Sequence, residues 1–297
     1  GISAYSNEDL FHQEALLTGV LTGLKKVAEE TKGINLIIVV GAPLRVDSRL
    51  FNCGLVLYRG KILGAAVKSY LPNYREFYEG RQFSPAAEAV SRTITLSGQE
   101  DIPFGADLIF DVAEIPNFRF YIEMCEDLWV PIPPSSFASL AGATVIGNLS
   151  ASNALIGKAE YRQSLAANQS ARCLAAYLYA AAGPGESTTD LAWDSHAMIF
   201  ENGNLLAQSE RFADHSQMIT ADIDLDRLTQ DRMRQNSFSR NAFPHQEKIL
   251  KFRKVEIKTA PIKGRLLLER SYDRFPYIPS DPAKRDERCY EAYSIQV

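Results

Sequence analysis

A cysteine stands where an apolar stretch of the chain meets an acidic pair. In "YIEMCEDLW", Cys125 ends the apolar run and is followed directly by Glu126 and Asp127. A cysteine becomes a nucleophile when a nearby cation, a helix N-terminus or a base favours its thiolate. A strand-to-helix corner here would leave backbone N–H groups free at a sheet edge of the kind where α/β proteins bind ligands. The residues alone leave two interpretations open, a nucleophile or a small core residue that ends a strand.

A lysine is the second candidate for chemistry. Lys68 lies at the end of an expected apolar strand in "GAAVKSYLPNYREFYE", where an ammonium group needs a partner or a site to serve. The alternative is a lysine whose aliphatic stem lies on the surface with its charge in water. The other thiols, Cys53, Cys173 and Cys289, are assigned to structure. No CxxC spacing or adjacent histidine indicates a metal site, and none is expected.

Composition excludes some classes of function. The 297 residues carry 32 basic and 36 acidic side chains, a net charge of -4, so the chain has no electrostatic footprint for nucleic acid. No apolar run approaches the length of a membrane span, and the first residues lack the features of a signal peptide. A cytoplasmic protein without a membrane partner is expected.

The elements that must position Cys125 and Lys68 are predicted from apolar patterning. A helix is expected between Asn7 and Gly33, and the β-branched run at 34–44 is typical of a strand covered on both faces. A hairpin is expected to turn at Arg59-Gly60 and to bring Lys68 to the end of its second strand. Strands are expected at 108–115 and 118–125.

The second half of the chain continues this alternation. A strand is expected at 144–152, a long helix from about Lys158 to Ala182, and a hairpin that turns at Asn202-Gly203. Strands that alternate with helices predict a layered α/β domain over residues 1–230. Residues 231–297 are rich in charge, proline and aromatics without a clear period, which indicates a linker or docking tail.

Three segments carry a resemblance to a known family. They are "KSYLPNYREFYEGRQF", "YIEMCEDLWVPIPPSS" and "GNLSASNALIGKAEYR", and "RFPYIPSDPAKRDERCYEAYSIQV" extends the match into the tail. Together they resemble the nitrilase (carbon-nitrogen hydrolase) superfamily, in particular the glutaminase domains of glutamine-dependent NAD+ synthetases. The resemblance implies a four-layer α-β-β-α sandwich. It also implies that an N-terminal strand, helix and strand precede Gly1 and are missing here.

The resemblance further implies a catalytic triad of glutamate, lysine and cysteine. Cys125 is then the nucleophile, and Lys68 holds the thiolate and stabilises the oxyanion together with the backbone N–H of Glu126. The base glutamate of the family lies just upstream of Gly1, and Glu8 is not assigned in its place.

Further site residues follow from the same motifs. Glu76 and Glu79 are candidates for a second carboxylate beside the lysine. The family pattern assigns substrate binding to Tyr74, Ser152 and Lys158. The sequence departs from the pattern at Lys158, where the family often has arginine, and a lysine loses the bidentate fork that arginine offers to a carboxylate.

The function that the resemblance implies is hydrolysis of glutamine through a cysteine thioester. The ammonia would supply an ATP-dependent synthetase domain of the same polypeptide, which amidates nicotinic acid adenine dinucleotide. No cofactor is expected for the glutaminase part, since ATP and magnesium belong to the synthetase domain, which is absent from this sequence. A homo-oligomer is expected. The alternatives are a stand-alone amidase or carbamoylase, a non-catalytic assembly module that lacks the base, and a thiol redox protein.

Overall fold

The computed structural model describes residues 1–186, 191–260, 264, 266–270, 272, 277–279 and 281–297. The chain divides into two compact units, Gly1–Lys263 and Gly264–Val297. Each unit is described by itself, and the first contains every candidate site residue.

The first unit contains a mixed five-stranded sheet with the order β1-β2-β3-β5-β4. Its strands are β1 (Ile37–Val46), β2 (Arg49–Tyr58), β3 (Lys61–Val67), β4 (Thr93–Leu96) and β5 (Gln99–Gly105). β1, β2 and β3 form an antiparallel meander, and β5 joins β3 in parallel. Lys68 follows β3 directly, as the sequence predicts.

The predicted hairpin between β2 and β3 is confirmed. Tyr58 pairs with Lys61, so the loop contains two residues, and both Arg59 and Gly60 have positive φ angles of 46° and 82°. This conformation matches the twist of the flanking strands and favours glycine at its second position. The turn therefore fixes the register that brings Lys68 to its place.

The second sheet has seven strands in the order β11-β10-β9-β8-β7-β6-β12. The strands are β6 (Leu108–Val112), β7 (Arg119–Met124), β8 (Val145–Ser150), β9 (Ala176–Ala181), β10 (Ala197–Glu201), β11 (Asn204–Gln208) and β12 (Arg253–Ile257). β7, β8 and β9 are parallel neighbours, so their carboxyl ends meet at one edge. Cys125 follows β7 at this edge.

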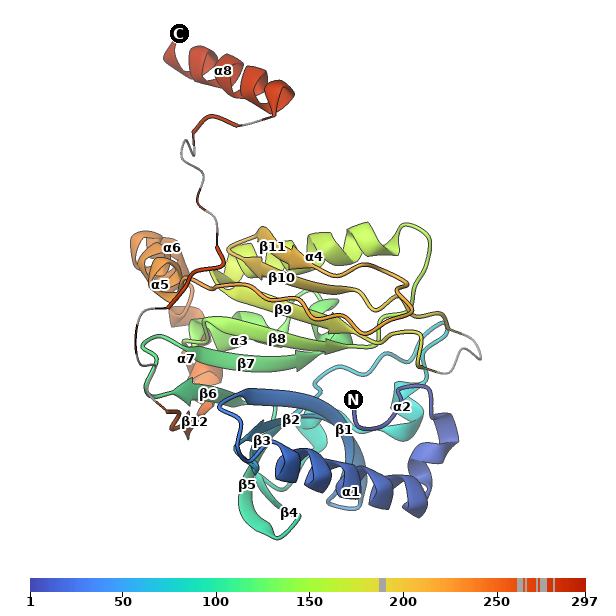
Figure 1. The fold of residues 1–297 in the computed structure, drawn as a ribbon. Helices are drawn as coiled ribbons and strands as arrows, with labels where there is room; N and C mark the ends of the chain where they lie inside the picture. Colours follow the sequence, from blue (N-terminus) through green and yellow to red (C-terminus); the bar gives the residue numbers. More distant parts are fainter. Residues whose placement is uncertain (187–190, 261–263, 265, 271, 273–276, 280) are drawn as a thin grey trace. The chain divides into compact units, whose positions relative to one another are not determined.

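Helices cover the outer faces of the two sheets (Figure 1). α1 (Glu14–Glu30) packs Val20 and Leu24 on the five-stranded sheet, and α3 (Pro134–Leu140) and α4 (Lys158–Cys173) cover the seven-stranded sheet. Between the sheets lies a second core, in which Val56 of β2 meets Phe110 and Ile122. At Gly54 an added Cβ would lie 2.9 Å from Ile122, so the sheets approach closely there. The predicted nitrilase-like α-β-β-α sandwich is confirmed.

The remaining helical segments are short. They are η1 (Glu8–His12), α2 (Glu79–Gln82), η2 (Ala86–Glu88), η3 (Cys125–Leu128), α5 (Leu225–Arg234), α6 (Asn236–Arg240), η4 (Phe243–His245) and α7 (Gln246–Ile249). The second unit contains α8 (Pro282–Gln296). No helix among the described residues is long and apolar enough to cross a membrane.

The predicted long helix from Lys158 to Ala182 is wrong in its second half. α4 ends at Cys173, where Leu174 takes a left-handed conformation with φ of 45°, and the chain then enters β9. β9 is hydrogen-bonded on both sides, to β8 and to β10. Tertiary pairing here overrides the helix propensity of an alanine-rich segment.

The predicted boundary at residue 230 stays a prediction. Beyond it, β12 pairs in parallel with β6 and so adds a strand to the sheet, and Ile257 is buried in the core between the sheets. Part of the predicted tail, at 261–263, 265, 271, 273–276 and 280, lies outside the described residues. The expected N-terminal strand, helix and strand ahead of Gly1 also stay a prediction.

Candidate active site

Cys125 is the first residue of η3 and lies at the corner where β7 ends. Its φ angle is 44°, a left-handed conformation that costs a residue other than glycine about 1–2 kcal/mol. Asn148 on β8 accepts a hydrogen bond of 3.0 Å from the Cys125 N–H. Because the N–H of Glu126 falls in the first helical turn, it has no acceptor within η3.

Asp127 ties this corner to the segment that follows Lys68. One carboxylate oxygen accepts from the N–H groups of Ser69 and Tyr70 at 3.2 and 2.9 Å, and the other accepts from Met124 N–H at 3.0 Å. Burial raises the pKa of Asp127 to about 7, with a further contribution from the nearby Glu123. This one buried side chain thus joins the strand ends that carry the cysteine and the lysine.

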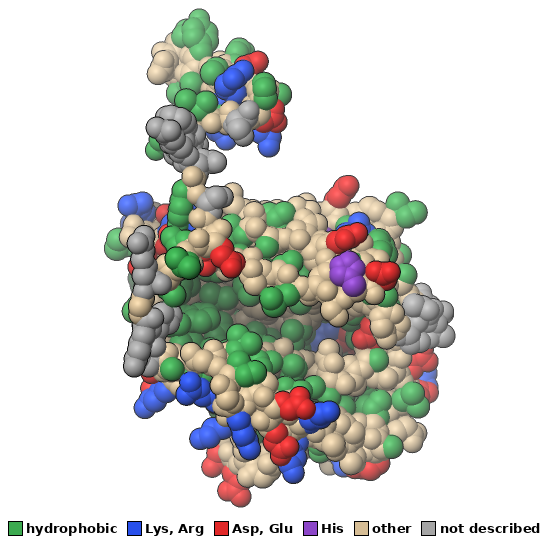
Figure 2. All heavy atoms as spheres, in the orientation of Figure 1, with side chains coloured by type: hydrophobic (Ala, Val, Ile, Leu, Met, Phe, Trp, Pro, Cys, Tyr) green, Lys and Arg blue, Asp and Glu red, His purple; other side chains and the backbone are tan. Residues whose placement is uncertain are grey.

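Cys125 and Lys68 line the same cavity, which has a volume of about 290 Å³. Its walls come from β1, β2, the ends of β7 and β8, and β9, and most of the residues are small or apolar. Figure 2 shows a hollow between the strands of the two sheets with hydrophobic side chains along its walls. The cavity therefore presents a thiol and an ammonium group among mostly uncharged residues, with Glu186 as a further charged side chain on its lining.

Lys68 forms a buried ion pair with Glu79. The Nζ atom lies 2.6 and 2.7 Å from the two carboxylate oxygens, and the side chains are 1% and 4% exposed. Burial lowers the pKa of Lys68, but the charges of Glu79 and Cys125 outweigh it and leave the pKa raised. Of the two candidate carboxylates, Glu79 is therefore the one that contacts the lysine.

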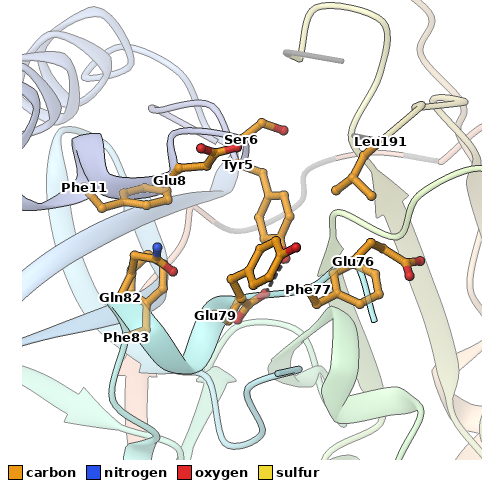
Figure 3. A pocket seen from close by; sticks show the side chains of 11 residues that line it. Tyr5, Ser6, Glu8, Phe11, Glu76, Phe77, Glu79, Gln82, Phe83 and Leu191 are labelled. Carbon is orange, nitrogen blue, oxygen red and sulfur yellow. Dashed lines mark hydrogen bonds between the residues drawn. The ribbon is translucent and has the colours of Figure 1, made fainter. Parts of the chain in front are cut away.

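Tyr5 completes the surroundings of Glu79. Its hydroxyl group donates a hydrogen bond of 2.9 Å to Oε1 of Glu79, and burial raises the tyrosine pKa. Figure 3 shows the Tyr5 ring pointing at Glu79 in a neighbouring cavity of about 60 Å³, with Phe11 and Phe77 on either side. Glu8 lines this smaller cavity and is not among the residues that line the cavity of Cys125.

Glu76 lies in a second polar cluster. It accepts a hydrogen bond of 2.8 Å from Nδ2 of Asn153, and Oδ1 of Asn153 accepts from Lys158. The Lys158 ammonium lies 5.3 Å from the ring centre of Trp129 and 5.6 Å from that of Phe77. Burial lowers the pKa of Lys158. Lys158 is thus held by an amide and two rings, without a direct ion pair among the described contacts.

The two other predicted substrate contacts are Tyr74 and Ser152. The Tyr74 hydroxyl donates to both carboxylate oxygens of Glu126, at 2.9 and 3.1 Å, while half of the Tyr74 side chain is exposed. Ser152 is buried, and its carbonyl oxygen accepts a hydrogen bond of 3.3 Å from Nη2 of Arg162. No contact between Ser152 and Lys158 is described.

Arg162 supports the loop that follows β8. Its Nη2 also donates to the carbonyl oxygen of Asn153 at 3.2 Å, and its Nη1 lies 3.0 Å from both carboxylate oxygens of Asp194. Nδ1 of His196 is 3.2 Å from the same Nη1. Arg162 and Asp194 are both fully buried, so this ion pair lies within the core of the unit.

Several residues of these clusters were not predicted from the sequence, among them Tyr5, Asn148, Asn153 and Arg162. Their signals are weak. Asn148 interrupts the apolar run "TVIGNLS", and a polar side chain inside such a strand needs a partner. Tyr5 and Arg162 stand in segments without a clear apolar pattern, so nothing local indicates that they are buried.

Two stacked sheets between helices, with a cysteine and a lysine at one cavity, define a nitrilase-like α/β protein. The carbon-nitrogen hydrolase family matches residues 1–233, and the chain belongs to that family. It is 48% identical to the glutamine-dependent NAD(+) synthetase of Mycobacterium tuberculosis strain H37Rv, over 100% of this chain and 43% of the relative. A Thermotoga maritima protein of the same name is 28% identical over 76% of this chain and 35% of its own length. The chain thus spans less than half the length of these relatives.

Solved structures resemble the fold. A glutamine-dependent NAD(+) synthetase from Cytophaga hutchinsonii gives a TM-score of 0.62 at 25% identity, covering 71% of this chain and 33% of that one. A carbon-nitrogen hydrolase from Helicobacter pylori G27 gives a TM-score of 0.60 at 15% identity, covering 84% of this chain and 82% of that one. The second likeness supports the fold alone.

Proposed function

We propose that this chain hydrolyses the side-chain amide of glutamine through a thioester on Cys125. The observation that carries the proposal is that Lys68, whose ammonium group is paired with the buried Glu79, lines the same cavity as Cys125. An ammonium group on the wall of the same cavity can stabilise the negative charge that develops when the Cys125 sulfur attacks a carbonyl. The relatives with 48% identity are named for their dependence on glutamine, which selects the substrate among amides.

The proposed first half of the reaction forms the thioester. The thiol proton passes to the base glutamate, which the family resemblance places upstream of Gly1, and the Cys125 sulfur attacks the amide carbon. The ammonium group of Lys68 and the N–H of Glu126 stabilise the tetrahedral oxyanion. The carbon–nitrogen bond then breaks, and ammonia leaves with the proton that the base returns. Water hydrolyses the thioester in the second half and releases glutamate.

We propose that the cluster around Lys158 binds the amino-acid end of glutamine. Lys158 supplies a positive charge for the α-carboxylate, and its amide and aromatic neighbours hold the ammonium group in a defined position. Tyr74 and Ser152 are proposed as further contacts. Glu76 reaches the cluster through Asn153 and is proposed to support it without touching the reacting atoms.

We further propose that the released ammonia serves a synthetase domain of the same polypeptide in a cytoplasmic homo-oligomer. The support for a further domain is that the relatives are more than twice as long as this chain. In that domain ATP and magnesium would activate the acceptor, whereas the glutaminase part needs no cofactor. Mass photometry of the purified protein tests the assembly, and a monomer would contradict it.

Covalent labelling with 6-diazo-5-oxo-norleucine tests the reaction at Cys125. The thiolate displaces nitrogen from this glutamine mimic and leaves a stable thioether, which mass spectrometry locates on a peptide. We expect one adduct, on Cys125, that glutamine suppresses and that simple aliphatic amides do not. Cys125→Ala should abolish the adduct while the melting temperature changes by only a few degrees.

The other outcomes distinguish the alternatives. Suppression by simple amides in preference to glutamine would favour a stand-alone amidase or carbamoylase. Absence of any adduct from the folded protein would favour a non-catalytic assembly module. Modification of Cys53, Cys173 or Cys289 in place of Cys125 would overturn the choice of nucleophile.

A further inference from the structure

A chain of buried hydrogen bonds leads away from the backbone of Cys125. Oδ1 of Asn148 accepts from the Cys125 N–H at 3.0 Å, and Nδ2 of Asn148 donates to the Tyr177 hydroxyl oxygen at 3.0 Å. Tyr177 in turn donates to Oε1 of Glu123 at 2.5 Å, and the Ser135 N–H donates to the other carboxylate oxygen at 3.0 Å. The three side chains between Cys125 and Ser135 have at most 1% of their surface exposed.

This series of hydrogen bonds crosses three adjacent strands of one sheet. Glu123 is on β7, Asn148 on β8 and Tyr177 on β9, and these strands are parallel neighbours. Glu123 pairs directly with Asn148, so their side chains lie on the same face. This face is the one covered by α3 and α4, and the cavity of Cys125 is lined by other residues. The cluster therefore does not touch the cavity and acts on it through the backbone of Cys125.

Burial of these polar side chains on this face of the sheet costs free energy. Glu123 has no cation within ion-pair distance among the described residues, and burial raises its pKa. Apolar side chains of similar volume commonly stabilise a core as well as or better than buried polar groups do. What the cluster provides instead is an acceptor fixed in place, because each member is hydrogen-bonded to the next.

The acceptor atom of Asn148 bonds to a residue with a strained backbone, Cys125. Cys125 has a φ angle of 44°, a rotation about its N–Cα bond that relates the N–H group held by Asn148 to the direction of the side chain. Without the acceptor, this buried N–H would lose its partner, and a relaxed backbone would turn the thiol away from its present direction. The bond also occupies the Cys125 N–H, which leaves the neighbouring Glu126 N–H as the backbone donor for an oxyanion.

We propose that Asn148, held by Tyr177 and Glu123, is a positioning residue that fixes the left-handed backbone of Cys125 and thereby aims its thiol at the substrate. The inference rests on the proposed nucleophilic function of Cys125 and extends it to residues that contact no substrate. Asn148→Leu should lower the rate of 6-diazo-5-oxo-norleucine labelling at saturating reagent at least tenfold. Tyr177→Phe keeps Asn148 but removes the hydroxyl group that holds it, and should lower the labelling rate severalfold.

A matched control separates positioning from loss of stability. Tyr121→Phe also removes a buried tyrosine hydroxyl of the same sheet, in a cluster with Ala138 of α3, and this hydroxyl donates to the Ala106 carbonyl at 3.0 Å and not to the cluster of Glu123. Both Tyr→Phe variants should lose a similar free energy of unfolding in urea, because each loses one buried hydrogen bond. The labelling rate should fall in Tyr177→Phe and not in Tyr121→Phe, and the glutamine concentration that half-protects Cys125 should change in neither.

The outcomes are distinct from those that test the proposed function. Wild-type labelling that glutamine does not suppress would count against glutamine as substrate but leave the rate comparison valid. If the mimic does not react at all, alkylation of Cys125 by iodoacetamide, read on its peptide, gives the same comparison of variants. A wild-type rate in Asn148→Leu, or equal losses in Tyr177→Phe and Tyr121→Phe, would overturn the positioning role.

Discussion

The Nζ atom of Lys68 lies between the two carboxylate oxygens of Glu79, at 2.6 and 2.7 Å, in a place that water scarcely reaches. β3 ends immediately before the lysine, and the glutamate opens α2. Folding buries the two charged groups together, and each charge compensates the other. This mutual dependence governs what substitution of either residue does.

Removal of one member of the pair should destabilise the unit strongly. Lys68→Met leaves a buried carboxylate and Glu79→Leu leaves a buried ammonium group, each at a cost of about 3–5 kcal/mol. The double variant leaves no uncompensated charge, so it should recover most of the loss. Urea unfolding of the four proteins measures the coupling, and simple additivity of the two losses would contradict it.

The pair Lys26 and Glu30 is the matched control. It lies on the exposed surface of α1, with the charged atoms 3.9 Å apart. Exposed pairs of this kind contribute about 0–1 kcal/mol. Lys26→Met should therefore change the free energy of unfolding by less than about 1 kcal/mol.

Neither Lys68→Met nor the double variant Lys68→Met/Glu79→Leu should react with the glutamine mimic, whatever its stability.

Arg162 should affect both stability and substrate binding. Arg162→Met leaves Asp194 buried without its main partner and removes the donors to the carbonyl groups of Ser152 and Asn153. We expect a loss of about 3–5 kcal/mol in the free energy of unfolding. We also expect at least tenfold weaker protection of Cys125 by glutamine, measured at a temperature where the variant is folded.

Arg211→Met is the control for this variant. Arg211 also contacts Asp194, with its Nε 3.0 Å from Oδ2, but it is partly exposed and no hydrogen bond joins it to the loop after β8 among the described residues. It should lose less stability and keep glutamine protection. Equal effects on protection in the two variants would show that Asp194, not the loop carbonyl contacts, carries the effect.

His196 should make the unit sensitive to acid. Burial and then the charge of Arg162 lower its pKa to about 4 from an ordinary value of 6.5, against the opposing effect of Asp194. Between pH 6.5 and 4 the unfolded chain binds the proton and the folded chain does not, so stability falls as the pH is lowered through this range. Below about pH 4 both states are protonated and the contribution is lost.

His196→Asn removes this titration and keeps an oxygen acceptor for Arg162. In urea unfolding at pH 7 and at pH 4.5, the wild type should lose more stability between the two values than the variant does. His215→Asn, at an exposed position, should behave as the wild type. Identical losses in the wild type and in His196→Asn would refute the assignment.

Much of the fold was predictable because its signals are local. The apolar run of β1 and the two-residue turn at Arg59-Gly60 each depend on a few adjacent residues, and these elements were predicted correctly. β9 was not predictable in this way. Its alanines favour a helix, and only pairing with β8 and β10 makes the segment a strand.

The candidate site was predictable only in part, for a related reason. Cys125 and Lys68 each stand at the end of an apolar strand, and this local anomaly marks them. The sequence does not show which of Glu76 and Glu79 faces the lysine, because that depends on where α2 begins. Tyr5 reaches Glu79 across 74 residues of chain, a relationship that no local pattern encodes.

Substitution of Lys158 by arginine should preserve or strengthen the binding of glutamine. Its ammonium group is held by Asn153 and by the rings of Phe77 and Trp129, and the resembling family often has arginine at this position. Lys158→Ala should weaken glutamine protection of Cys125 by about 10- to 100-fold, because a charged hydrogen bond contributes about 1.5–3 kcal/mol. In Lys158→Arg, glutamine should protect Cys125 as well as in the wild type or better, since a guanidinium group offers two parallel donors to a carboxylate and also stacks on aromatic rings.

The control reagent is iodoacetamide, which has no carboxylate, so its rate of reaction with Cys125 should differ little between Lys158→Ala and Lys158→Arg. If Lys158→Ala retained full glutamine protection, the α-carboxylate would have to be bound by other residues.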